Sequence, residues 1–288
     1  MITRKNPVPT KTVRSVLRGP FKDKARLVYG AIKTQTERDA LAFCTRAGVT
    51  SDAGRIQISN FVRGCKRLGI WSSLICWPMR SYQNAPSGDT LYSLGGLATR
   101  NGTISGPARS PEGMVFDGLN DRVTGSSIGS NLEIHVGFFG KFGDLSNNPV
   151  AVQIDGLGLR SVTSRPNGTW NNTDRSASDT SRILTTNTWL MFSGGFYNTV
   201  FPVASRFQQG FNNAYTNNIG DPSLGSATVL GISIGASIAG ANYLNGTIAL
   251  VYMFNPRSNF LGEGPATHQS AAFYRLCQTT LLSGLPIP

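Results

Sequence analysis

Carboxylates and histidines, the side chains that most often perform acid–base chemistry or bind metals, are few and widely spaced in this sequence. The 288-residue chain has two histidines, His135 and His268, too few for a histidine-rich metal centre. Glycoside hydrolysis needs two carboxyls about 5 to 9 Å apart, most simply from alternate residues of one strand. The glutamates form no such run: Glu37, Glu112, Glu133 and Glu263. We therefore expect a structural or binding protein rather than an enzyme, with no cofactor.

The pair Asp117 and Asp121 is the best candidate for a metal site. The two residues lie in the segment FDGLND, residues 116–121. Their carboxylate oxygens are suitable ligands for Ca²⁺. Asp, Gly and Asn also favour tight turns, and we prefer this second interpretation. The sequence thus predicts a turn, with calcium binding as the alternative.

The polar segment 164–180 contains one aromatic residue, Trp170, close to Asn171 and Asp174. An aromatic ring among amides and carboxylates can stack on a sugar ring while the polar groups bond its hydroxyls. The alternative is that Trp170 is a buried anchor for the loop, which we favour. These three residues are a weak candidate for a carbohydrate site.

Positive charge is concentrated at the N-terminus. The net charge of +12 is contained in residues 1–84, because the rest of the chain has equal numbers of basic and acidic residues. Such a basic arm attracts polyanions through counterion release, so we expect nucleic acid or an acidic protein surface as its partner. The alternative is a disordered terminus that aids solubility. Residues 1–33 contain one acid, Asp23, and the candidate binding residues Arg4, Lys5, Lys11, Arg14, Arg18, Lys22, Lys24, Arg26 and Lys33.

Two short helices are predicted after the arm. Residues 36–48 have apolar groups at helical spacing, with Thr36 as the expected cap and Gly48 as the end. Residues 50–68 repeat the pattern and stop at Gly69. The apolar run 70–79 follows and could pack this helical pair onto the next part of the chain. The cysteines have no CxxC spacing, and we expect them to be reduced and buried: Cys44, Cys65, Cys76 and Cys277.

From about Gly88 the composition and patterning indicate β structure. Gly and Asn clusters separate short alternating or aromatic runs, which is typical of a sandwich or a barrel. Helical spacing returns at residues 267–282, and no apolar run is long enough to cross a membrane. We divide the chain into an arm (1–35), a helical region (36–87) and a β domain with a C-terminal helix (88–288). The expected strands are 114–116, 132–139, 150–154, 189–192, 229–234 and 247–254.

Two segments, PEGMVFDGLNDRV (111–123) and YLNGTIALVYMFNPR (243–257), resemble the opening and closing strands of laminin-G-like, concanavalin A-like jelly rolls. The resemblance implies a mainly β antiparallel sandwich with a small N-terminal helical region and a C-terminal helix. The order of parts also resembles uncharacterised tailed-phage proteins thought to be virion components such as capsid decorations or fibres. The matching segments are 46–50, 68–71, 273–276 and 284–286, whereas the basic arm departs from the pattern.

These resemblances imply a virion structural protein, synthesised in the host cytoplasm. We expect its sandwich to pack against other virion subunits, as a homo-oligomer, and its arm to contact nucleic acid or an acidic shell surface. No membrane contact is expected. The alternative function is a lectin-like module that binds glycans on a host cell.

Overall fold

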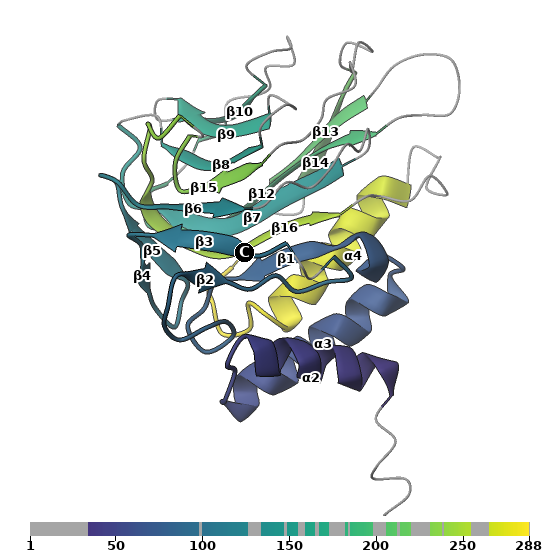
Figure 1. The fold of residues 1–288 in the computed structure, drawn as a ribbon. Helices are drawn as coiled ribbons and strands as arrows, with labels where there is room; N and C mark the ends of the chain where they lie inside the picture. The colour runs from purple at the N-terminus through teal and green to yellow at the C-terminus, as the bar shows by residue number, and fades with distance from the viewer. Residues whose placement is uncertain are drawn as a thin grey trace, which may run out of the picture.

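Two antiparallel sheets pack face to face, and helices cover the outer face of one of them (Figure 1). This confirms the predicted mainly β sandwich with a small N-terminal helical region and a C-terminal helix. The basic arm lies outside the described residues. The computed structural model describes residues 34–97, 100–125, 134–146, 149–154, 159–164, 167–172, 182–183, 185–197, 206–211, 214–219, 231–237, 239–254 and 265–287.

The first sheet, which we call sheet A, has the strand order β14-β13-β12-β7-β16-β5-β4 within the described residues. β1 also pairs with β16, so a segment that the sequence placed in the helical region forms part of this sheet. The strands are β1 Ile75–Pro78, β4 Ala108–Arg109, β5 Met114–Asp117, β7 Ile134–Phe142, β12 Leu190–Tyr197, β13 Arg206–Phe211, β14 Ala214–Ile219 and β16 Asn245–Phe254.

The second sheet, sheet B, has the strand order β11-β10-β9-β8-β15-β6-β3-β2, again within the described residues. β15 is inserted between β6 and β8, so strands distant in sequence become neighbours. The strands are β2 Thr90–Leu91, β3 Gly102–Ser105, β6 Arg122–Gly125, β8 Val150–Ile154, β9 Leu159–Ser164, β10 Asn167–Asn172, β11 Arg182–Ile183 and β15 Ile232–Ile234.

The space between the sheets is filled by aliphatic and aromatic side chains from alternate strand positions. Trp77 of β1 is fully buried here, and its indole N–H donates to the carbonyl of Arg100 at 3.0 Å. The side chains of this core include Phe116, Val123, Phe138, Val152, Ile154, Ile232, Ile234 and Val251.

Helices α2 (Gln35–Arg46) and α3 (Asp52–Arg67) begin at side-chain caps. α2 is capped by Thr34: its hydroxyl accepts from the Glu37 N–H at 3.2 Å, and its own N–H donates to the Glu37 carboxylate at 2.8 Å. The prediction of Thr36 as the cap was wrong, because both halves of this capping box need the 34–37 spacing. Ser51 caps α3, within the predicted start of that helix.

The helices pack on the face of sheet A that points away from sheet B, at the lower right of Figure 1. Here α3, the short helix η2 (Trp71–Ser73) and α4 (Pro265–Thr279) share a second apolar core with β1 and β16. Phe273 of α4 lies between Phe61 of α3 and Tyr252 of β16, at ring-centroid distances of 5.9 and 4.7 Å. β16 is therefore covered on both faces.

All four cysteines are buried, as predicted. Burial raises the pKa of Cys65, Cys76 and Cys277 well above the usual thiol value, which keeps these groups protonated and unreactive. No helix of the described residues is long and apolar enough to cross a membrane.

Candidate ligand-binding face

A line of polar residues crosses sheet B from strand to strand. The register pairs each member with the next, so the residues lie side by side across adjacent strands. We call this set the polar row: Thr90 of β2, Thr103 of β3, Thr124 of β6, Ser233 of β15, Gln153 of β8, Arg160 of β9 and Asn171 of β10.

The row lies on the outer face of sheet B, away from sheet A. Val123 packs between the sheets, so its neighbour Thr124 points the other way. Likewise Ile232 and Ile234 belong to the inter-sheet core, which leaves Ser233 on the outer face. The alternation of apolar and polar residues in these short strands thus builds an apolar inner face and a hydroxyl-bearing outer face.

Among the members whose exposure the structure describes, the row presents hydroxyl and amide groups. Thr103 and Thr124 are exposed, and Thr90 and Gln153 are half-buried. Ser233 is only 2% exposed, and its hydroxyl has no hydrogen-bond partner among the described residues. Neighbouring strands are about 4.8 Å apart, so the face presents regularly spaced donors and acceptors to a polyhydroxylated ligand.

The turn between β15 and β16 forms a rim beside this face. In this turn the Ala241 N–H donates to the Ser237 hydroxyl at 3.0 Å, and the Gly240 N–H donates to the Ser237 carbonyl at 2.9 Å. Arg122 of β6 reaches this rim, because a Cβ atom placed on Gly240 would lie 3.5 Å from its Nη1. The same Cβ would lie 3.4 Å from the hydroxyl of Tyr243. The guanidinium and the phenol therefore converge on one glycine.

Asp117 and Asp121 form a hydrogen-bonded turn. The Asp121 carboxylate accepts from the Asp117 N–H at 2.9 Å, and the Asp117 carboxylate accepts from the Leu119 N–H at 2.8 Å. Burial raises the pKa of Asp121, which is 6% exposed. The described residues contain no cluster of three or more His, Cys, Asp or Glu suited to a metal ion. The turn, which we preferred from the sequence, accounts for both carboxylates, and calcium binding stays the untested alternative.

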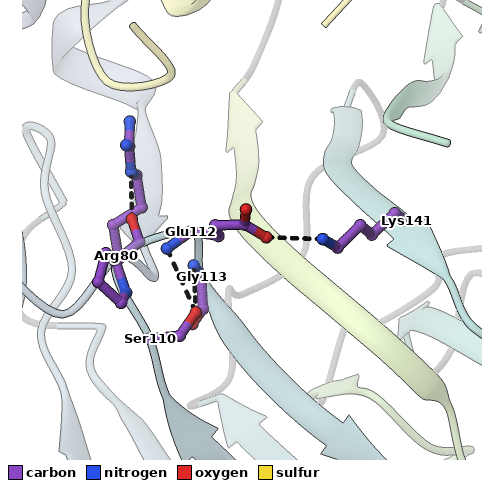
Figure 2. A network of polar contacts seen from close by, with 6 residues as sticks. Arg80, Ser110, Glu112, Gly113 and Lys141 are labelled. Carbon is purple, nitrogen blue, oxygen red and sulfur yellow. Dashed lines mark hydrogen bonds and ion pairs between the residues drawn. The ribbon is translucent and has the colours of Figure 1, made fainter. Parts of the chain in front are cut away.

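Figure 2 shows a separate polar network where the chain enters β5. The Ser110 hydroxyl accepts from the N–H groups of Glu112 and Gly113, at 3.2 and 3.1 Å. The Glu112 carboxylate pairs with the Lys141 ammonium of β7 at 2.6 Å, and this ammonium lies 5.2 Å from the ring centroid of Trp189. The groups satisfy one another, so we interpret this network as a structural tie between β5 and β7.

The structure describes only part of the sites predicted from sequence. Trp170 and Asn171 lie in β10, where their register partners are Ser161 and Arg160. Asn171 thereby joins the polar row. Asp174 and the nine bases of the arm lie outside the described residues. The other members of the polar row were missed, because only the strand order brings them together.

Comparisons with known proteins identify the fold. No known protein family matches the chain, and none of the curated proteins matches it in sequence. Among solved structures, Trypanosoma rangeli sialidase matches with a TM-score of 0.53 and 10% identity, over 80% of this chain and 40% of that chain. The same sialidase in complex with 2,3-difluorosialic acid matches with a TM-score of 0.51 and 10% identity, over 79% of this chain and 39% of that chain.

A third similar structure is the binding domain of botulinum neurotoxin DC in complex with rat synaptotagmin II, with a TM-score of 0.48 and 10% identity over 71% of this chain and 52% of that chain. The two sialidase chains are longer than the part that matches: this chain spans about 40% of their length. The two sialidase structures define the class as a β-sandwich protein, in agreement with the predicted antiparallel sandwich.

These comparisons correct one expectation. The sparse carboxylates led us to expect that the chain is not an enzyme, and that inference was wrong as drawn, because sialidases, which are enzymes, share this fold over about 40% of their chain. The physical reason is that a sandwich can assemble a site from residues far apart in sequence. A close run of alternating carboxylates is therefore no requirement for catalysis on this fold.

Proposed function

We propose that the protein is a carbohydrate-binding, lectin-like protein that holds its ligand on the outer face of sheet B. The observation that carries the proposal is the polar row, in which seven adjacent strands each contribute one polar residue at the same register. Saccharides offer many hydroxyls at short spacing, and they need donors and acceptors fixed by a rigid scaffold. A sheet backed by an apolar core supplies that rigidity.

The fold supports the same proposal. Among the solved structures that share it is a sialidase in complex with 2,3-difluorosialic acid, a sugar derivative. In this chain the exposed part of the row includes the Thr103–Thr124 pair, whose two residues face each other across β3 and β6.

The test replaces these two hydroxyls by methyl groups. Threonine and valine have the same shape and both favour strands, so Thr103→Val together with Thr124→Val keeps the sheet and removes two hydrogen-bonding groups. We expect saccharide binding on a glycan array, followed by calorimetry, to weaken about 10-fold or more, with no loss of thermal stability.

The matched control is Val115→Thr on β5, which makes the reverse exchange at a position that is 39% exposed on sheet A. This variant should bind as the unchanged protein does. Binding that survives the double Thr→Val exchange would place the saccharide elsewhere. Failure of the unchanged chain to bind any saccharide would refute the proposal as a whole.

A second proposal concerns the basic arm, whose nine bases face a single acid in residues 1–33. We propose that it contacts nucleic acid or an acidic shell surface within a virion. If about six of these cations meet phosphates, log K should fall with log salt at a slope near −5. Changing Arg14, Arg18, Lys22 and Lys24 together to Ala should flatten that slope by about 3 to 4, measured by DNA binding at several salt concentrations. An unchanged slope would refute the role of the arm.

A further inference from the structure

We propose that the saccharide bound by this face is acidic, and that the Arg122 guanidinium recognises its carboxylate or sulfate group. The inference rests on the proposed function, because it names the chemical class of the ligand for the same face. It is carried by the position of Arg122, by its lack of a partner among the described residues and by the geometry of the rim beside it.

Arg122 shares the outer face with the polar row. It is two residues before Thr124 on β6, and the residue between them, Val123, points into the inter-sheet core. Its register partner on β3 is Ser105, which is exposed. Arg122 and Ser105 therefore lie on the same pair of strands as Thr103 and Thr124, two residues further along it, a separation of about 7 Å that one or two sugar rings can span.

Arg122 is also an arginine with unused donors. It is half-buried, yet it makes no ion pair or hydrogen bond with the rest of the described chain. Its sequence neighbour Asp121 has its carboxylate committed to the Asp117 N–H. Several other arginines donate to backbone carbonyls instead: Arg46, Arg55, Arg80 and Arg109. A guanidinium has five N–H donors, and partial burial without a partner is costly, so this arrangement suits an external anion.

The rim leaves room for that anion. Gly240 has a φ of 70°, a conformation that favours glycine, and it has no side chain between the Arg122 guanidinium and the Tyr243 hydroxyl. Hydrogen bonds within the 237–241 turn hold this edge in place. Two oxygens of a carboxylate or sulfate can accept from the guanidinium and the phenol together, while ring hydroxyls meet the threonines.

A saccharide is favoured over a nucleic acid because the charge on the described part of this face is sparse. Phosphate backbones are bound by several clustered cations, whereas here the arginines Arg122 on β6 and Arg160 on β9 are separated by β15 and β8, among residues that bear hydroxyl and amide groups. A ligand with an occasional negative charge and many hydroxyls fits that distribution.

The experiment uses the full chain and calorimetry with matched probes. Trigalacturonic acid is compared with its methyl ester, which has the same hydroxyls and no charge, and a sulfated galactoside is compared with the unsulfated one. We expect tighter binding of the acid than of the ester. Arg122→Gln should reduce acid binding about 10- to 100-fold and leave ester binding unchanged. The sulfated pair shows whether sulfate replaces carboxylate.

The control is Arg38→Gln on the exposed surface of α2, which should alter neither affinity. Equal affinity for acid and ester, or acid binding that survives Arg122→Gln, would overturn the inference while leaving the carbohydrate-binding proposal intact. Absence of binding to any saccharide, charged or neutral, would overturn both. Tighter, Arg122-dependent binding of an oligonucleotide would overturn the saccharide assignment and identify a phosphate ligand.

Discussion

Replacing Arg80 by alanine is expected to lower the free energy of unfolding by about 3 kcal/mol. Arg80 is 7% exposed, and its guanidinium donates to the carbonyls of Pro111 (2.7 Å), Leu281 (3.1 Å) and Ser283 (2.9 Å). Figure 2 shows its contact with the segment before β5. Removal would leave three carbonyls without this donor and open a cavity beside the ring of Tyr82, which lies 4.7 Å from the guanidinium carbon.

The measurement is urea unfolding of the variant and of Arg38→Ala, an exposed arginine whose loss should cost less than about 0.5 kcal/mol. Arg80→Lys should recover little, because one ammonium cannot reach carbonyls on both sides of the site as the planar guanidinium does. Equal stability of the Arg80 and Arg38 variants would show that the hydrogen bonds of Arg80 do not hold the C-terminal segment in place.

The second large effect is a dependence of stability on pH through His135. Burial in β7 lowers the pKa of His135 from 6.5 to about 3, since its ring is 1% exposed and packs against Phe254 and Tyr252. The unfolded chain therefore binds a proton between pH 6.5 and 3 that the folded chain excludes. Stability from this site is complete above pH 6.5 and falls by about 1.4 kcal/mol per unit as the pH decreases.

His135→Phe removes this titration and keeps an aromatic ring of similar size. Between pH 7 and pH 4 the variant should lose about 3 kcal/mol less unfolding free energy than the unchanged protein, measured by urea unfolding at both values. Val123→Ala removes apolar groups from the inter-sheet core and not from the cluster around His135, so it should lower stability equally at the two pH values. A pH dependence that is identical with and without His135 would contradict the assigned burial effect.

Local patterns in the sequence predicted the sandwich but not all of its strands. The strand at residues 150–154 matches its predicted bounds, because apolar residues and flanking turns mark it. β13 and β14 were missed, since their sequences RFQQGF and AYTNNI show no run of apolar alternation. We interpreted the residues of β1 as an apolar packing segment and not as a strand, because all four are buried and the segment shows no alternation of apolar and polar residues.

The candidate face could be predicted only in fragments. The alternation of Arg122, Val123 and Thr124 is visible in the sequence and marks one face of a strand. The position of Ser233 between Thr124 and Gln153 depends on pairing between strands that are distant in sequence, since β15 joins β6 and β8 only in the folded sheet. Strand order and register, which short-range patterns do not encode, create the polar row.

The pairing of β1 with β16 determines when the chain can fold. Cys76 of β1 pairs with Tyr252 of β16, and α3 packs against α4, so the early helices complete their core with segments that the ribosome makes much later. The nascent chain therefore cannot complete this core until β16 and α4 have been synthesised, and the apolar surfaces of α2 and α3 stay uncovered until then. A chaperone that shields those surfaces during elongation would act on the step at which this topology is most prone to aggregate.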